Sequence, residues 1–136
     1  MSFSLQNHTA DVAVEATGET LDAVFGATAD GMAAAMCETT PSVGERFALS
    51  VTAESRESLL FDYLDELIYQ RDVRGVLPVD NRATVIQSGE DWTVDASARG
   101  VPLDAIAARE VKAVTYSEMV LEPTADGWQA YVVLDV

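Results

Sequence analysis

Basic side chains are scarce in this sequence, and their scarcity excludes several kinds of function. The 136 residues include 8 Lys and Arg against 23 Asp and Glu, which gives a formal net charge of −15. Proteins gain most of their affinity for nucleic acid from Lys and Arg, because these side chains release the counterions of the phosphates. The composition therefore predicts that the chain does not bind nucleic acid directly, and it disfavours an anionic membrane surface for the same reason.

Cysteine, histidine and long apolar runs are also lacking. The single Cys37 excludes a disulfide framework within the chain, and the single His8 excludes a zinc centre built from two or three histidines. No apolar run approaches the ~20 residues that cross a membrane. The N-terminal residues before Thr9 include no Lys or Arg and no apolar stretch, so they do not resemble a signal peptide. Together these absences predict a cytoplasmic protein.

Every basic residue except Lys112 is an arginine. Such an acidic, lysine-poor and alanine-rich composition is typical of proteins from a high-salt cytoplasm. At molar salt the Debye length falls to about 3 Å, so a large net charge causes little self-repulsion. We therefore expect a halophilic source, with most carboxylates on the solvated surface. An acidic protein from a low-salt cytoplasm is the alternative interpretation.

The sequence contains enough apolar material for one core. Hydrophobic residues make up 49% of the chain, and no linker, repeat or low-complexity stretch divides it, so we expect a single domain over residues 1–136. Apolar residues at helical spacing predict an amphipathic helix over residues 21–36, with Thr20 as its N-cap. A second amphipathic helix with a wide apolar face is predicted to begin after Ser55.

The other elements are predicted to be strands, because apolar and polar residues alternate along them. They cover residues 12–16, 46–53, 73–79, 82–87, 92–98, 110–121 and 128–136. We expect Asp80 and Asn81 to form a turn between two of these strands, and residues 100–109 to form a long connection with room for a helical turn. The predicted fold class is α+β, a single domain with two amphipathic helices packed against a largely antiparallel β-sheet.

The first group of candidate functional residues lies near the N-terminus. His8 with Thr9 and Asp11 either orients an imidazole or caps backbone groups in a turn, as short polar side chains commonly do. Cys37 would need a base to act as a nucleophile, and His8 is the sole imidazole in the sequence, so a small buried or half-buried thiol is the favoured interpretation. No pattern assembles a catalytic site, and we do not expect an enzyme.

Two further candidates lie toward the C-terminus. Asp135 is either a solvated side chain or, with a carbonyl or carboxylate oxygen of Val136 and another acid, a ligand of a hard cation such as calcium. Lys112 either persists by chance on an exposed strand or marks a position that needs a compact ammonium. Strand alternation from residue 110 onward places Lys112 on the same face as Glu110.

Four segments together resemble the archease family. They are the run His-Thr-Ala-Asp at residues 8–11 with the following residues to 21, and residues 59–69, 110–116 and 133–136. They occur in the same order as in that family and span almost the whole chain. The sequence departs from the family pattern at Asn7, where a Glu is expected, and at Ser117, where a His commonly follows Thr-Tyr. No role in binding a metal or a partner is carried over to those two positions.

The resemblance implies a protein cofactor rather than a catalyst. Archeases act with the RtcB-type, GTP-dependent RNA ligase of tRNA splicing, where they promote formation of the guanylylated-histidine intermediate and multiple turnover. A chaperone-like role toward a tRNA cytosine-5 methyltransferase is the alternative function. An independent hydrolase that uses His8 with Asp11 ranks far below both.

The resemblance also implies where the functional residues lie. The family carries a calcium site, which implies calcium or another divalent cation on Asp11, Asp135 and Val136. Contacts with the partner protein are expected from His8, Glu110 and Lys112.

Overall fold

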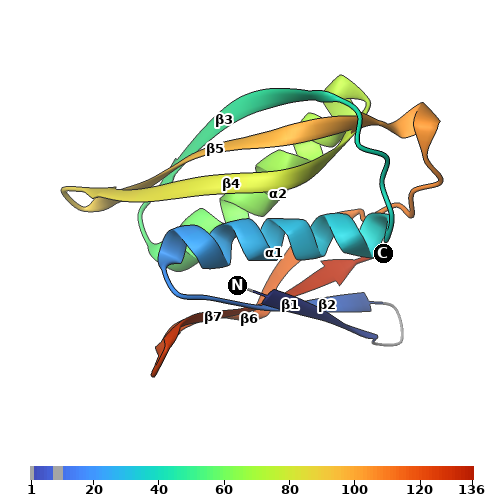
Figure 1. Ribbon diagram of the computed structural model, residues 1–136. Helices are drawn as coiled ribbons and strands as arrows, with labels where there is room; N and C mark the ends of the chain where they lie inside the picture. The colour runs from blue at the N-terminus through green and yellow to red at the C-terminus, as the bar shows by residue number, and fades with distance from the viewer. Residues whose placement is uncertain (1, 8–10) are drawn as a thin grey trace.

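Two helices lie between two antiparallel sheets in the computed structural model, which describes residues 2–7 and 11–136 (Figure 1). One sheet has the strand order β1-β2-β7-β6, and the other has the order β3-β5-β4. The elements are β1 (Ser2–Asn7), β2 (Asp11–Gly18), α1 (Leu21–Met36), β3 (Glu45–Ala53), α2 (Arg56–Arg74), β4 (Val76–Ser88), β5 (Asp91–Pro102), the short 3-10 helix Leu103–Ala105, β6 (Ala113–Thr124) and β7 (Gly127–Asp135). The predicted α+β class is confirmed, with the strands divided between two sheets.

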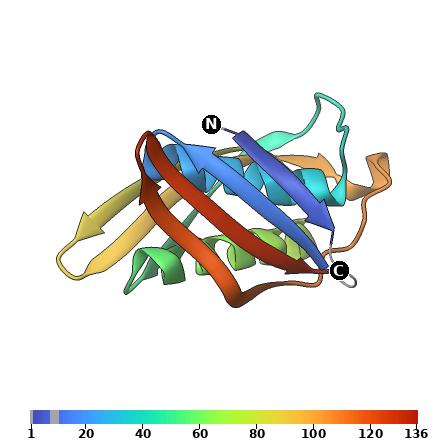
Figure 2. The same cartoon turned by 90° about the horizontal axis from the view of Figure 1, so that it is seen from below.

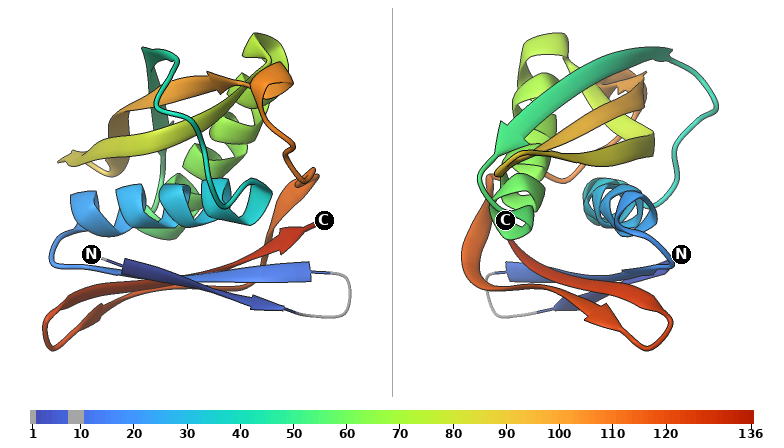
Figure 3. Two further views of the ribbon diagram at one scale, coloured as in Figure 1. Left: turned by 45° about the vertical axis from the view of Figure 1, so that its right-hand side comes forward. Right: turned by 90° about the vertical axis from the view of Figure 1, so that its left-hand side faces the viewer.

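Helix α1 is buried on most of its sides because it packs against both sheets (Figure 3). The hydroxyl of Thr20 accepts a hydrogen bond from the N–H of Ala23 at 3.1 Å, which confirms the predicted N-cap. Gly26 lies against β4, where an added Cβ would be 3.1 Å from the carbonyl oxygen of Asn81. On the other side, a Cβ on Gly31 would clash with the Val14 side chain of β2 at 2.5 Å. The two glycines therefore allow α1 to approach both sheets closely.

Helix α2 contributes its apolar face to the same core. Ser55 caps its first turn by accepting from the N–H of Ser58 at 3.1 Å, as predicted, and Gly75 ends it in the left-handed conformation with φ of 65°. Its apolar face is buried, and the members of that face are Leu59, Leu60, Tyr63, Leu64, Leu67 and Ile68. Arg71 lies on the same face one turn after Leu67, and only 8% of its surface is exposed.

The predicted turn at Asp80 and Asn81 is wrong. The two strands expected over 73–79 and 82–87 form one strand, β4, and residues 73–74 belong to α2. The pairing of β4 with β5 shifts between Val79 and Arg82, so Asp80 and Asn81 form a bulge. The backbone N–H of Asn81 donates to the carboxylate of Asp30 in α1 instead of to β5. Because this bond satisfies the unpaired N–H, the chain continues through the bulge and does not reverse.

The predicted start of the strand at residue 110 is also wrong, since β6 begins at Ala113. Within β6, residues 116–119 form an irregular bulge opposite β7, between the pairs Thr115–Val133 and Val120–Tyr131. The bulge turns the ring of Tyr116 onto Phe61 of α2, with 5.2 Å between the ring centres. The final hairpin is confirmed, because Thr124 pairs with Gly127. Strand β1 was not predicted.

Candidate functional site

Asp11 and Asp135 lie at one end of the four-stranded sheet. Asp11 is the first residue of β2 and Asp135 the last of β7, and their Cα atoms are direct partners in the antiparallel register. Their neighbours Val12 and Leu134 are buried in the core beneath the helices. Side chains alternate between the faces of a strand, so the two carboxylates share the outer face of the sheet. Figure 2 views the molecule from this outer side and shows the C-terminus beside the start of β2.

This arrangement places two negative charges opposite each other. Both side chains are half-buried, and neither makes a hydrogen bond or ion pair with any residue in the ranges 2–7 and 11–136. Like charges on directly opposed residues destabilise a sheet, and a bound cation relieves the repulsion. The register thus brings Asp11 and Asp135 together, and their role as metal ligands stays a prediction.

The donor set fits a hard cation. The described residues contain no group of three or more His, Cys, Asp and Glu side chains able to hold a metal. Within residues 2–7 and 11–136, the oxygen donors that the resemblance implies are the carboxylates of Asp11 and Asp135 and a main-chain oxygen of Val136, the residue after Asp135. An all-oxygen set suits calcium, which accepts carbonyl and water ligands beside carboxylates, whereas zinc prefers nitrogen and sulfur.

Lys112 is joined to this pair through its backbone. Its N–H donates to the carbonyl oxygen of Asp135 at 2.8 Å, and the next residue, Ala113, is the register partner of Asp135 on β6. The Lys112 side chain is exposed. The predicted placement of Lys112 and Glu110 on one face of a strand is wrong, because both residues precede β6.

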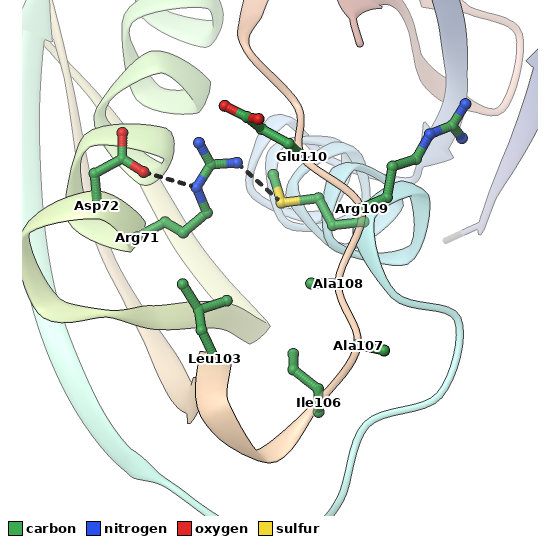
Figure 4. A pocket seen from close by; sticks show the side chains of 9 residues that line it. Arg71, Asp72, Leu103, Ile106, Ala107, Ala108, Arg109 and Glu110 are labelled. Atoms are coloured by element: carbon green, nitrogen blue, oxygen red, sulfur yellow. Dashed lines mark hydrogen bonds and ion pairs between the residues drawn. The ribbon is translucent and has the colours of Figure 1, made fainter.

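The helices explain why the strand does not extend back to residue 110. The N–H of Arg109 donates to the carbonyl oxygen of Met36 at the end of α1, at 2.6 Å. The carbonyl oxygen of Val111 accepts from Nη1 of Arg71 in α2 at 2.9 Å. Backbone groups that would otherwise join the sheet are thus bonded to the two helices. Glu110 is exposed between them and lines a hollow of about 410 Å³ (Figure 4).

The predictions for His8 and Cys37 have different outcomes. His8 lies outside the described residues, so its place at the site stays a prediction. Cys37 follows α1, is half-buried, and donates its thiol to the carbonyl oxygen of Thr39 at 3.2 Å. This placement agrees with the interpretation of Cys37 as a half-buried thiol.

Comparison with known proteins identifies the family. The model of the archease protein family (MTH1598/TM1083) matches residues 3–136. The chain belongs to the archease family. The archease of Methanosarcina acetivorans is 37% identical over 139 residues, which cover 98% of this chain and 95% of that protein. The archease of Pyrococcus furiosus is 31% identical over 138 residues, which cover 95% of this chain and 94% of that protein.

Solved structures agree with the archease fold. The solution structure of Methanobacterium thermoautotrophicum protein 1598 superposes with a TM-score of 0.84 at 28% identity and covers 99% of both chains. The crystal structure of a Thermotoga maritima archease, described as a possible chaperone, gives a TM-score of 0.56 at 21% identity, with 96% of this chain and 94% of that one covered. Among the described residues of this archease, no helix has both the length and the apolar character needed to cross a membrane.

Sequence reasoning missed Arg71, the buried basic residue that reaches the segment before β6. A signal for it was present, because Arg71 follows Leu67 by four residues and therefore continues the apolar face of α2. A guanidinium on a buried helix face needs hydrogen-bond partners, since an unpaired buried charge is costly. In this archease the partners are the carbonyl oxygen of Val111, the sulfur of Met36 and the carboxylate of Asp72.

Proposed function

We propose that this archease is a non-catalytic cofactor that activates an RtcB-type, GTP-dependent RNA ligase in tRNA splicing. It would promote guanylylation of the ligase and allow multiple turnover. The observation that supports this most directly is the pair Asp11 and Asp135, with the sole lysine of the chain hydrogen-bonded to it through the backbone. In a chain with 23 acidic residues, two opposed carboxylates thus lie beside the backbone of the sole lysine.

The carboxylates of Asp11 and Asp135 and an oxygen of Val136 would hold calcium. When bound, calcium supplies the positive charge that two opposed carboxylates lack. Asp11 then ties the start of β2 to the end of β7, and the Asp135 carbonyl oxygen holds the N–H of Lys112. The role of these residues is to fix the backbone from which the Lys112 side chain extends.

Lys112 would act directly on the ligase. Its exposed ammonium is a compact point charge that can reach a phosphate or carboxylate in the active site of the partner. Glu110, two residues earlier and also exposed, and His8 are further candidates for contact with the ligase. An acidic cofactor also complements a ligase whose RNA channel is basic, which speeds encounter at low salt. At molar salt this attraction is screened, so close contacts decide specificity.

The experiment is RNA ligation by the cognate ligase under multiple-turnover conditions, with and without this protein. We expect the protein to raise both the number of turnovers and the fraction of guanylylated ligase formed from labelled GTP. The variant Asp135→Asn removes one carboxylate of the opposed pair. Its matched control is Asp126→Asn, which removes an exposed carboxylate in the hairpin between β6 and β7. Incubation of the protein alone with nucleotides and RNA should give no turnover.

The outcomes separate the three candidate functions. A ligase that turns over equally well without the protein would contradict activation. If the protein instead suppresses light scattering by an aggregating tRNA cytosine-5 methyltransferase, the chaperone-like function takes its place. Turnover of nucleotides or RNA by the protein alone would point to the hydrolase.

A further inference from the structure

The segment over residues 106–112 carries Lys112, and its one fully buried side chain is that of Val111, which belongs to the core. A hollow of about 410 Å³ lies on one side, lined by Arg71, Leu103 and Ile106 among others (Figure 4). A second hollow of about 470 Å³ lies on the other side, where Leu5, Ala35 and Cys37 are among the lining residues. Residues 107–110, which line these hollows, are exposed. Two hydrogen bonds to the helices, together with the buried Val111 side chain, therefore determine where this segment lies.

Arg71 provides the side-chain bond to this segment. Its Nη1 donates to the carbonyl oxygen of Val111 at 2.9 Å and lies 3.5 Å from the sulfur of Met36. Its Nε donates to Asp72 at 3.0 Å, but the side chain of Asp72 is 63% exposed. An ion pair open to solvent contributes little, whereas a buried hydrogen bond from a charged donor is strong. The bond to Val111 is therefore the contact of Arg71 that matters for the fold of this segment.

Two consecutive hydrogen bonds connect Arg71 with the carboxylate pair. Arg71 holds the carbonyl oxygen of Val111, and the N–H of the same peptide unit, which belongs to Lys112, donates to the carbonyl oxygen of Asp135 at 2.8 Å. One peptide plane is thus fixed at both ends, by α2 on one side and by the end of β7 on the other. Asp135 in turn pairs with Asp11.

We infer that Arg71 is a positioning residue for the cation site and for Lys112, acting through the peptide unit between Val111 and Lys112. The inference rests on the proposed function and extends it to a residue that reaches the site through the backbone alone. Arg71 sets where the Asp135 carbonyl oxygen and the Lys112 side chain lie. Without it, the carbonyl oxygen of Val111 loses its partner, and the segment between the two hollows loses a restraint.

The test compares Arg71→Met with Arg74→Met. Methionine keeps an unbranched stem on the buried face of α2 but has no donor for Val111. Arg74 is matched to Arg71, because it lies in the same last turn of α2 and carries the same charge. Its guanidinium bonds Gln70 and lies over the ring of Phe47, 4.4 Å from the ring centre, away from the segment. Both variants therefore remove one positive charge from the last turn of α2.

Two measurements report on the inference. Hydrogen exchange of the Lys112 amide, followed by NMR, should become at least tenfold faster in Arg71→Met and stay unchanged in Arg74→Met, while amides in the middle of β2 and β7 keep their protection. Titration with calcium should show at least tenfold weaker binding to Arg71→Met only. Arg71→Lys, which keeps one charged donor, should restore part of both properties, and it replaces Arg71→Met as the test variant if that variant does not fold.

The results distinguish this inference from the proposed function. A Lys112 amide as protected in the Arg71 variant as in the parent, with equal calcium binding, overturns the inference even if the ligase is activated. If the parent binds no calcium, the cation part of the proposed function fails, but loss of protection at Lys112 in Arg71→Met alone still supports the positioning role. Equal loss in Arg71→Met and Arg74→Met would show a general effect at the end of α2 and overturn the inference.

Discussion

Asp30 in α1 accepts two hydrogen bonds from Asn81 in β4. The backbone N–H and the side-chain amide of Asn81 both donate to one carboxylate oxygen of Asp30, each at 2.9 Å. The pair joins the central helix to the bulge of the three-stranded sheet. Nearby, the buried hydroxyl of Tyr63 and the side-chain oxygen of Asn81 have no hydrogen-bond partner among the described residues. The contact between α1 and β4 thus includes a polar pair in which the side-chain oxygen of Asn81 is left unsatisfied.

The first prediction concerns the pH dependence of this pair. Burial raises the pKa of the Asp30 carboxyl above its usual range, although the hydrogen bonds from Asn81 oppose the shift. Because the folded state then binds the proton more tightly than the unfolded state, this group stabilises the fold at low pH and loses that contribution as pH rises through its folded pKa. Asp30→Asn does not titrate, so its stability relative to the parent should increase from pH 3.5 to pH 7.

The measurement is urea unfolding of the parent and Asp30→Asn in molar salt across that pH range, with Asp126→Asn as the control for loss of a carboxylate. A difference in unfolding free energy that does not change with pH would contradict the raised pKa. A difference that changes in the opposite direction would show that the hydrogen bonds from Asn81 outweigh burial.

The second prediction concerns salt. The ion pairs of Arg71 with Asp72 and of Arg99 with Asp80 leave the net charge of −15 uncompensated. At 0.01 M salt the Debye length is about 30 Å, so carboxylates across the whole molecule repel one another. We expect the Tm to rise from millimolar to molar potassium chloride. Calorimetry in both buffers measures this, and equal values would remove the argument for a halophilic source.

The third prediction concerns calcium. A ligand that binds only the folded state stabilises it by mass action, by about 2.7 kcal/mol at a concentration 100 times its Kd. Calcium should therefore raise the Tm of the parent and of Asp126→Asn, but not of Asp11→Asn or Asp135→Asn. Without calcium, the last two variants should be at least as stable as the parent, because they remove the repulsion between paired carboxylates. A response of both variants equal to that of the parent would place the cation elsewhere.

Local signals made the helices predictable from the sequence. The spacing of apolar residues along α1 and α2 and the caps at Thr20 and Ser55 depend on neighbours within one or two turns. The hairpin of β6 and β7 was predictable for the same reason, since the residues between Thr124 and Gly127 have a strong turn preference. The prediction that Asp11 and Asp135 lie together came instead from the resemblance to a family, because no local pattern relates residues at opposite ends of the chain.

Contacts between distant segments determined what the sequence did not reveal. The Asp30 carboxylate accepts the N–H of Asn81, which forms a bulge in place of the predicted reversal. Bonds from both helices to Arg109 and Val111 hold the segment before β6, so residues 110–112 lie outside the predicted strand. The division into two sheets is likewise a long-range property. Arg56 lies 5.6 Å from the ring centre of Trp92 in one sheet and 5.0 Å from that of Trp128 in the other. No period in the sequence relates these three residues.

The fourth prediction concerns Lys112, and the structure makes it sharper than the sequence did. The Lys112 side chain has no hydrogen bond or ion pair with any described residue, while its N–H donates to Asp135. Substitution of the side chain leaves that N–H in place, so Lys112→Ala and Lys112→Arg should keep the parent Tm and the parent calcium affinity. Any loss of ligase guanylylation in these variants then reports on the ammonium itself.

We expect both variants to stimulate guanylylation poorly, by roughly tenfold or more for Lys112→Ala, the size of effect that the loss of one charge-assisted contact of about 1.4 kcal/mol produces. Arginine should fail as well, because its planar guanidinium has a different reach and spreads its charge over a fork.

Arg109→Ala is the matched control, since it removes an exposed cation from the same segment and leaves the bond between the Arg109 N–H and Met36 intact. If Lys112→Arg folds and activates the ligase like the parent, Lys112 is one more solvated charge. If Arg109→Ala lowers activation as much as Lys112→Ala, the ligase responds to the total charge of the segment and not to the position of this ammonium.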